Sequence, residues 1–439
     1  MPPEAVTCRG EPVAELLVVR GGRRLEGAVK VAGAVNTVLP IMAAAALAAD
    51  VSVIENVPRC RDVEVMADIL RSLGCEVELT DGGRLAVDAR RLSSTHAPAE
   101  LCGRIRGSYY AAGMLLGRAG QFEVGLPGGD SIGGRPVDFH LKGFSALGAE
   151  VVTERGYMVG RARSLRGVEF LVPRRSVGTT INLMLAAVLA EGTTVLRNAA
   201  LEPEVTDTAV FLNLMGARIR GAGTPTVVVE GVRRLHGARY AVIPDRIEAG
   251  TYLVAGAATG GDVEVDALIP EHVTALLSKL AEAGCQVDAN TDRVRVRAPR
   301  RLRAVDIDTA PFPGFATDLH PPFAALLATA EGQAVVRETI YDGRMGYAYE
   351  LVKMGADIRV DGNTAYVRGV ERLTGATVQA LDIRAGAAMV IAGLVAEGET
   401  RITGVEHLDR KYEGLERKLR SLGAEVWRTS EAELAARGA

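Results

Sequence analysis

One phrase recurs six times along this chain and constrains its fold more than any other feature: an apolar helix end, a glycine, an alanine or cysteine, and then a strand. A typical copy reads Leu147-Gly148-Ala149-Glu150-Val151. Self-similarity at a fixed period indicates a supersecondary unit that is copied along the chain. The glycines of the six copies follow one another at intervals of about 70 residues and are Gly74, Gly148, Gly216, Gly284, Gly355 and Gly423.

A second phrase precedes copies of the first: an alanine-rich helix, a glycine, and a short strand, as in Ala186 to Leu196 and Ala392 to Ile402. The glycine is typical of a left-handed helix cap, and the β-branched residues after it favour a strand. Each unit therefore reads helix, strand, loop, helix, strand, with a further strand such as Thr226–Val229. Six such units predict an α/β fold with two domains of three units each.

The composition agrees with two domains and limits the partners. A chain of 439 residues is too long for one ordinary core. Its 51 Lys+Arg against 54 Asp+Glu give no global charge that would favour a nucleic acid or a membrane. The longest apolar run, Leu39 to Ala49, is shorter than the roughly 20 residues of a membrane helix and reads as a buried helix. We therefore expect a cytoplasmic protein with no nucleic-acid and no membrane partner.

The five cysteines are scattered, which suits a reducing compartment better than a disulfide framework. Cys75 and Cys285 occupy the repeat position that alanine fills in the other four copies, so they read as small packing residues. The six histidines show no HxH or HExxH spacing. We therefore expect no metal site.

A glycine-rich stretch, residues 126–140, combines converging backbone N–H groups with Asp130 and Arg135, which is typical of an anion site. The alternative is a turn with two solvated charges. The repeat places this stretch among five equivalent loops, and arginine is frequent in them. Converging guanidinium groups would suit a small polyanion, although each alone is typical of a surface charge. The candidates are Arg61, Arg106, Arg135, Arg344, Arg384 and Arg410.

Neither the phosphate loop GxxxxGK[ST] nor a GxGxxG fingerprint is present to explain these arginines. Instead, motifs spread over nearly the whole chain resemble those of the UDP-N-acetylglucosamine 1-carboxyvinyltransferases, in the enolpyruvyl transferase family that also includes the shikimate-pathway member. The matching motifs, in chain order, are Gly33–Asn36, Pro127–Asp130, Arg135–Asp138, Ser176–Gly178, Pro244–Glu248, Pro313–Asp318, Asp382–Arg384 and Asp409–Glu413.

The resemblance implies a two-domain inside-out α/β barrel built from six βαβαββ repeats, three per domain. It places the N-terminal domain at residues 35–242, with a mobile loop at 126–140, and the C-terminal domain at residues 1–34 plus 243–439. It further implies a monomer or a weak homo-oligomer.

The family reaction moves the enolpyruvyl group of phosphoenolpyruvate to a hydroxyl of an acceptor, here a uridine nucleotide, by addition and elimination with release of phosphate. It needs an acid, a base and cations for the phosphate and the carboxylate, and no metal or cofactor. Two acceptors stay open: UDP-N-acetylglucosamine, as in peptidoglycan synthesis, and the 3'-hydroxyl of UMP, as in the related transferases of nucleoside-antibiotic biosynthesis.

Roles follow from the resemblance residue by residue. The catalytic positions are Asp318 as the base for the acceptor hydroxyl, Asp130 as the acid, and Arg410. The phosphoenolpyruvate-binding positions are Arg106, Arg135 and Arg410 for the phosphate, with Arg344 and Arg384 for the carboxylate. The nucleotide and acceptor positions are Asn36, Arg135, Pro136, Val137, Asp138, Ser176, Val177, Gly178, Glu202, Asp318, Ile340 and Asp342.

Two positions depart from the family pattern. Asp130 stands where most members have a cysteine acid, and a carboxylic acid can donate that proton if its surroundings raise its pKa. Val35 stands where the family has a lysine beside phosphoenolpyruvate, which deletes a charge-assisted contact. The alternative reading is therefore a catalytically silent protein that still binds a uridine nucleotide.

Overall fold

A computed structural model describes residues 15–80, 82–130, 132–133, 136–430 and 432–433. These residues form two compact units. Unit 1 consists of the described parts of Met1–Val31, Arg246–Ala310 and Gly314–Ala439, and unit 2 of the described parts of Ala32–Asp245 with Pro311–Pro313. Each unit has its own apolar core.

Within the described residues, the strands of unit 2 form three sheets of one topology, ordered β14-β3-β5-β4, β6-β7-β9-β8 and β10-β11-β13-β12. In each, the first pair is parallel and the others antiparallel: His96 of β6 lies beside Glu123 of β7, and Val124 of β7 beside Met158 of β9. The strands are β3 (Val51–Glu55), β4 (Glu76–Thr80), β5 (Arg84–Asp88), β6 (His96–Ala97), β7 (Gln121–Gly125), β8 (Glu150–Glu154), β9 (Tyr157–Arg161), β10 (Glu169–Leu171), β11 (Thr193–Arg197), β12 (Arg218–Arg220), β13 (Thr226–Glu230) and β14 (Arg239–Ala241).

Unit 1 repeats this topology in the sheets β16-β17-β15-β2, β18-β19-β21-β20 and β22-β23-β1-β24. The chain's first described strand, β1, lies between two of its last strands, with Val18 beside Arg401 of β23 and Trp427 of β24. The strands are β1 (Glu15–Arg20), β2 (Glu26–Lys30), β15 (Asp262–Asp266), β16 (Gln286–Ala289), β17 (Arg293–Arg297), β18 (Ile307–Asp308), β19 (Gln333–Arg337), β20 (Asp357–Asp361), β21 (Thr364–Arg368), β22 (Thr377–Gln379), β23 (Glu399–Thr403) and β24 (Glu425–Ser430).

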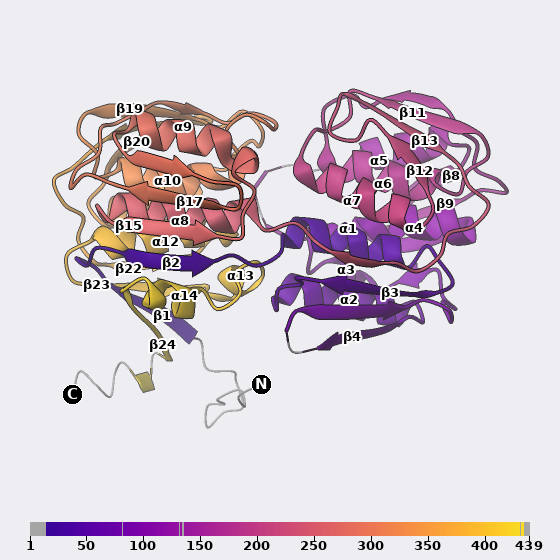
Figure 1. The fold of residues 1–439 in the computed structure, drawn as a ribbon, viewed down its shortest axis with the longest axis horizontal. Helices are drawn as coiled ribbons and strands as arrows, with labels where there is room; N and C mark the ends of the chain where they lie inside the picture. The colour runs from indigo at the N-terminus through magenta and orange to yellow at the C-terminus, as the bar shows by residue number, and fades with distance from the viewer. Residues whose placement is uncertain (1–14, 81, 131, 134–135, 431, 434–439) are drawn as a thin grey trace. The chain divides into compact units, whose positions relative to one another are not determined.

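Three helices form the centre of each unit, with the sheets around them (Figure 1). They are apolar on all sides and almost wholly buried, as expected for helices without a solvent face. Among the described residues, no helix combines the length and apolar character needed to cross a membrane. The central helices are α1 (Val35–Ala45), α4 (Tyr110–Ala119) and α6 (Val177–Ala187) in unit 2, and α8 (Arg246–Ala258), α10 (His320–Leu327) and α12 (Ile383–Val395) in unit 1.

A second set of helices lies before the repeat phrase, and each ends at its glycine. Gly148 has φ +100°, and the N–H of the next residue, Ala149, bonds back to the carbonyl of Phe144 at 3.0 Å. This is the Schellman cap, which needs a left-handed residue. All six repeat glycines have φ above +90°. The helices they end are α2 (Arg61–Ser72), α5 (Asp138–Ala146), α7 (Pro203–Leu214), α9 (Thr274–Glu282), α11 (Gly346–Lys353) and α14 (Leu415–Ser421).

Short turns complete the units and carry several candidate residues. They are the helices α3 (Ala99–Cys102) and α13 (Glu406–Asp409) and the 3-10 turns η1 (Arg106–Tyr109), η2 (Pro270–Val273) and η3 (Thr317–Leu319). Cys75 and Cys285 are buried beside their repeat glycines, and burial raises the pKa of the Cys75 thiol to about 11. Both therefore behave as small packing residues.

The segment that leaves unit 2 is tied to α7 by Asp207. Its buried carboxylate accepts hydrogen bonds from the Tyr240 hydroxyl and, at 3.3 Å, from the Ile243 backbone N–H. Burial raises the pKa of Asp207 to about 6, against the lowering effect of those two hydrogen bonds and with the help of the Glu204 charge. Ionising this carboxyl above that pH therefore destabilises unit 2.

We predict that Asp207→Asn changes how stability depends on pH. The native pKa lies above the ordinary value of 3.8, so the stabilising contribution is full below about pH 4 and is lost as pH rises through about 6. Asparagine does not titrate. The wild-type free energy of unfolding, relative to the variant, should fall by about 3 kcal/mol between pH 4 and 8 in denaturant titrations. A difference that stays constant with pH would contradict this.

Candidate active site

Three charged side chains of unit 1 meet at Asp318. One carboxylate oxygen, Oδ1, lies 2.9 Å from Nη1 of Arg344. The other, Oδ2, accepts from Nε and Nη2 of Arg384 at 3.1 and 2.9 Å. The two arginine side chains are only 2% and 4% exposed, whereas the Asp318 side chain is 24% exposed. The carboxylate is thus the accessible member of a cluster with two buried cations.

Each of these residues comes from a different local structure. Asp318 lies in η3 directly before α10, and Arg344 lies in the loop between β19 and α11. Arg384 is the second residue of α12, whose cap, Asp382, accepts from the N–H groups of Arg384 and Ala385 at 2.8 and 3.0 Å. Such a cap fixes the first helical turn, and so it fixes the direction in which Arg384 leaves the helix.

The two arginines decide the charge state of Asp318. Burial would raise its pKa, but the attraction of Arg384 and Arg344, together with their hydrogen bonds, holds the pKa of Asp318 well below its usual range. Asp318 is therefore ionised at neutral pH and is a weak base while both arginines contact it. An anion that displaced it from the arginines would make it a stronger base.

Arg384 has a second anchor in Tyr412. Its Nη1 donates to the Tyr412 hydroxyl at 3.1 Å, its guanidinium carbon lies 5.6 Å from the Tyr412 ring centroid, and that hydroxyl is 2.9 Å from the hydroxyl of Thr251. Tyr412 lies in the motif Asp409–Glu413. The first residue of that motif, Asp409, accepts at Oδ2 from Nη1 of Arg428 on β24 at 2.9 Å. Asp409 therefore holds the motif in place, and half-buried Arg410 follows it at the end of α13.

Arg344 also contacts residues to which the motifs gave no role. Its Nη1 donates to the Thr317 hydroxyl at 2.8 Å, and that hydroxyl donates to Glu338 at 2.6 Å. The Glu338 carboxylate also lies 2.8 Å from Nδ1 of His320. Burial would raise the pKa of Glu338, but these contacts lower it to about 2. Glu338 is therefore an ionised carboxylate at neutral pH, and the Thr317 hydroxyl links it to Arg344.

In unit 2, the glycine-rich loop packs on the segment that carries Arg106. A Cβ on Gly128 would lie 1.7 Å from the carbonyl oxygen of Gly103, and one on Gly129 would lie 3.1 Å from Cβ of Arg106. Only glycine allows the first approach. Gly128 and Gly129 therefore pack against the segment from Gly103 to Arg106. The loop ends at Val137, because Asp138 begins α5 and its residues up to 140 are helical.

The start of α6 is a second feature of unit 2. Ser176 caps it by accepting from the Thr179 N–H at 3.2 Å, which leaves the Val177 and Gly178 N–H groups at the helix N-terminus, where anions bind. A Cβ on Gly178 would lie 2.3 Å from the Tyr109 hydroxyl, so glycine is needed there. His140, whose ring lies 4.6 Å from that of Tyr109, has its pKa lowered to about 3 by burial and by Arg106.

Three further sequence candidates lie at the ends of α1 and α7. Val35 begins α1 and is 0% exposed within the apolar core of unit 2, and Asn36 follows it half-buried. Glu202 immediately precedes α7 and accepts from the Phe312 N–H at 3.4 Å. Val35 thus packs in the apolar core of unit 2, at the position where the resemblance places the family lysine.

Comparison with known proteins identifies the family. The family model of EPSP synthase (3-phosphoshikimate 1-carboxyvinyltransferase) matches residues 19–419. The chain belongs to this family of enolpyruvyl transferases. The enzyme is 55% identical over 412 residues to UDP-N-acetylglucosamine 1-carboxyvinyltransferase 2 of Symbiobacterium thermophilum, covering 94% of this chain and 97% of that one. It is 50% identical over 417 residues to UDP-N-acetylglucosamine 1-carboxyvinyltransferase 3 of Caldanaerobacter subterraneus subsp. tengcongensis, covering 95% and 100%.

Solved structures share the fold of this enolpyruvyl transferase. The enolpyruvyl transferase NikO from Streptomyces tendae has a TM-score of 0.85 at 30% identity, covering 95% of this chain and 100% of that one. EPSP synthase from Acinetobacter baumannii has a TM-score of 0.72 at 19% identity, covering 95% and 100%. The family resemblance of the motifs and the predicted inside-out α/β fold are both confirmed.

The predicted site residues of this enolpyruvyl transferase fall into two groups. In unit 1, hydrogen bonds bring together Asp318, Arg344 and Arg384, while Ile340 and Asp342 share the loop of Arg344, and Arg410 lies at the end of α13. Arg135 lies outside the described residues. The unit 2 group is Asn36, Arg106, Asp130, Pro136, Val137, Asp138, Ser176, Val177, Gly178 and Glu202.

The sequence motifs gave no role to Thr317, Glu338 or His320, although Thr317 lies in the motif Pro313–Asp318 and Glu338 begins the loop that carries Arg344. One sequence feature indicates Glu338: it is a charged residue directly after the strand β19, at the start of a loop whose backbone N–H groups need acceptors. That pattern does not identify the partners, because the contacts of Glu338 with His320 and Thr317, and of Thr317 with Arg344, join residues 18 to 27 positions apart.

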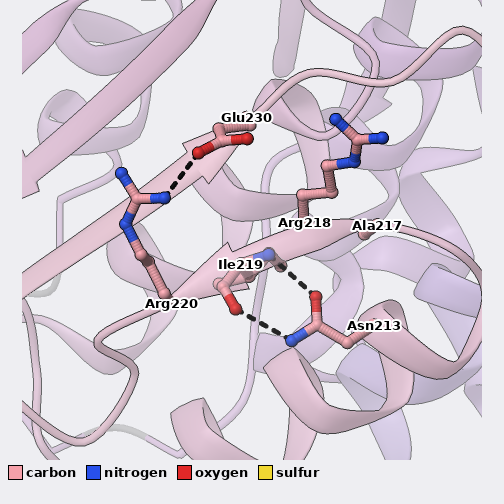
Figure 2. A pocket seen from close by; sticks show the side chains of 6 residues that line it. All are labelled: Asn213, Ala217, Arg218, Ile219, Arg220 and Glu230. Atoms are coloured by element: carbon pink, nitrogen blue, oxygen red, sulfur yellow. Dashed lines mark hydrogen bonds and ion pairs between the residues drawn. The ribbon is translucent and has the colours of Figure 1, made fainter.

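A surface pocket of unit 2 lies at the C-terminal end of α7 (Figure 2). The candidate Glu202 lies at the other end of that helix. The Asn213 amide bonds the N–H and carbonyl of Ile219 on the edge strand β12 at 2.8 and 2.9 Å, and Arg220 pairs with Glu230. These side chains cover a strand edge, so we assign the pocket no part in the chemistry. Its lining residues are Asn213, Ala217, Arg218, Ile219, Arg220 and Glu230.

We predict that Asp318→Asn lowers the free energy of unfolding at pH 7 by about 3 kcal/mol, because it leaves two buried guanidinium groups without an anion. The lowered pKa means that the stabilisation by Asp318 is present above its ordinary pKa of 3.8 and is lost as pH falls below it. Denaturant titrations should therefore show a smaller difference at pH 3 than at pH 7. An equal difference at both values would contradict this account.

Proposed function

We propose that this enzyme transfers the enolpyruvyl group of phosphoenolpyruvate to a hydroxyl of UDP-N-acetylglucosamine and releases phosphate. The observation that carries the proposal is the pair of buried arginines, Arg344 and Arg384, that converge on the accessible carboxylate of Asp318. Two guanidinium groups can bind a small carboxylate by paired hydrogen bonds, and a carboxylate between them can serve as a base.

The donor's carboxylate binds Arg344 and Arg384 in this proposal. Nε of Arg344 is buried and has no acceptor among the described residues, so this cation still has a donor to offer. The incoming carboxylate competes with Asp318 for the guanidinium N–H groups. As these contacts weaken, the pKa of Asp318 rises toward its usual value, and Asp318 can take the proton of the acceptor hydroxyl.

The addition step then forms a bond between the acceptor oxygen and C2 of phosphoenolpyruvate, while C3 gains a proton from Asp130. The tetrahedral adduct expels phosphate when C3 loses a proton. Arg106, Arg135 and Arg410 stabilise the phosphate, as the family motifs imply. Their positive charges stabilise the leaving group, and no metal enters these steps.

Most of the nucleotide and acceptor positions implied by the motifs lie in unit 2, whereas Asp318, Ile340 and Asp342 lie in unit 1. The N-terminus of α6 at Val177 and Gly178 offers backbone N–H groups to a nucleotide phosphate, and Arg135 to Asp138 match the family's uracil segment. The high identity to relatives named UDP-N-acetylglucosamine 1-carboxyvinyltransferase supports the sugar nucleotide as acceptor. UMP, the other acceptor that the resemblance of the motifs leaves open, is the second acceptor to be tested.

Turnover with separate acceptors tests the proposal. We expect phosphate release, and a product with the mass of the enolpyruvyl ether, when the protein is incubated with phosphoenolpyruvate and UDP-N-acetylglucosamine, and no release with UMP. Asp318→Asn is the control: it should abolish turnover and preserve nucleotide affinity measured by calorimetry.

Each other result has a meaning. Release with UMP alone would reassign the acceptor. Binding of either nucleotide without release would identify a silent homologue, in line with apolar packing at Val35. Unchanged turnover of Asp318→Asn would refute the assignment of the base.

We predict that epoxide inhibitors that alkylate the family's cysteine leave this enzyme active. Asp130 replaces that cysteine, and a carboxylate is a much weaker nucleophile than a thiolate toward such reagents. Intact-protein mass spectrometry after incubation should show no adduct on the wild type, and Asp130→Cys should become labelled. An adduct on Asp130 would contradict the prediction.

A further inference from the structure

Thr317 links Arg344 to a carboxylate outside the Asp318 cluster. Its hydroxyl lies 2.8 Å from Nη1 of Arg344 and 2.6 Å from Oε2 of Glu338. A guanidinium has donors and no acceptor, whereas an ionised carboxylate has acceptors and no donor. The Thr317 proton therefore points at Glu338, and an oxygen lone pair faces Arg344.

Glu338 holds that hydroxyl in one orientation. Its side chain is 0% exposed, and among the described residues three donors reach Oε1 and two reach Oε2. A carboxylate with donors on both oxygens is fixed in position as well as in charge. The donors that reach it among the described residues are the hydroxyls of Thr309 (3.0 Å) and Thr317 (2.6 Å), the backbone N–H groups of Ile340 (2.6 Å) and Tyr341 (3.1 Å), and Nδ1 of His320 (2.8 Å).

The same carboxylate fixes the loop on which Arg344 lies. The N–H groups of Ile340 and Tyr341 bond Oε1, and the Tyr341 ring centroid lies 5.6 Å from the guanidinium carbon of Arg344. Glu338 thus acts on Arg344 in two ways: through the loop backbone, and through the Thr317 hydroxyl at the guanidinium itself.

We propose that Thr317 and Glu338 are positioning residues that hold Arg344 in the orientation in which it binds the carboxylate of phosphoenolpyruvate. The inference rests on the proposed function, because it assigns that carboxylate to Arg344. In this proposal both residues act through the arginine, so neither needs to contact the substrate. Their loss therefore weakens binding of the donor and leaves binding of the nucleotide unchanged.

The test compares Thr317→Val with Thr317→Ser. Valine keeps the shape of threonine and removes the hydroxyl, so the charged guanidinium of Arg344 loses one hydrogen-bond acceptor. We expect the KM for phosphoenolpyruvate to rise about tenfold or more, with the KM for the nucleotide within about twofold of the wild type. Serine keeps the hydroxyl and should restore the KM for phosphoenolpyruvate.

Thr309→Val is the matched control. The Thr309 hydroxyl donates to the same carboxylate, at Oε1, and accepts from the Thr339 N–H at 2.8 Å. This variant therefore removes two hydrogen bonds around Glu338 without removing one from Arg344. The KM for phosphoenolpyruvate should stay within about twofold of the wild type. An increase equal to that of Thr317→Val would overturn the proposal, because general loosening would then explain both.

Glu338→Gln tests the route through the hydroxyl. Oε1 faces three donors, so the glutamine oxygen takes that side and its NH2 group faces Thr317, whose proton then lacks an acceptor. We expect a higher KM for phosphoenolpyruvate in this variant, and little further increase when it is added to Thr317→Val. If the increases in KM of the two single variants multiply fully in the double variant, Glu338 does not act through the Thr317 hydroxyl, and the proposal is overturned. Melting temperatures of all variants show which of them fold.

Failure of this inference and failure of the proposed function give different results. If the wild type turns over and Thr317→Val has an unchanged KM for phosphoenolpyruvate, only the inference is wrong. If the wild type releases no phosphate, phosphoenolpyruvate binding is measured by calorimetry: about tenfold weaker binding to Thr317→Val supports the inference, and equal binding overturns it. If the wild type does not bind phosphoenolpyruvate at all, both are overturned.

Discussion

Two buried guanidinium groups that share one carboxylate set the requirements for much of unit 1. A buried cation is strongly destabilising unless anions and hydrogen-bond acceptors surround it. Asp318 meets that need for both Arg344 and Arg384, the Tyr412 hydroxyl adds an acceptor for one, and the Thr317 hydroxyl adds one for the other. Several otherwise unrelated polar residues are therefore explained by a single electrostatic constraint.

The repeat determines where such residues can stand. A buried central helix can present polar side chains to solvent only near its first turn. A strand can be followed by polar side chains in the loop after it. Candidates at or just before a central helix are Asn36, Arg106, Ser176, Asp318 and Arg384, and those in a loop after a strand are Asp130, Glu202, Arg344 and Arg410. Six copies of one unit thus give equivalent positions, and the proposed donor, base and nucleotide roles depend on which residue stands at each of them.

Much of the fold could be predicted from the sequence, because the repeat glycines need a left-handed conformation and so mark the end of each outer helix. Arg344, Arg384 and Asp318 could be named from motifs, but their shared contact could not, since it depends on the three-dimensional positions of η3, α12 and the loop after β19. Val35 shows the opposite limit. A missing lysine reads as a missing charge, whereas the structure shows an apolar side chain that fills the core at the start of α1.

The third sheet of unit 1 joins the two ends of the described chain. β1 is bonded on both sides by β23 and β24, and Arg20 and Glu399, which pair across it, are 379 positions apart. During synthesis, nearly all of unit 2 emerges while this strand, with its four buried residues Leu16 to Val19, still has no neighbour. An unpaired apolar strand invites association with other chains. The first described strand is therefore among the last to be covered, so unit 2 can fold first, and the third sheet of unit 1 can be completed only after translation has passed β24.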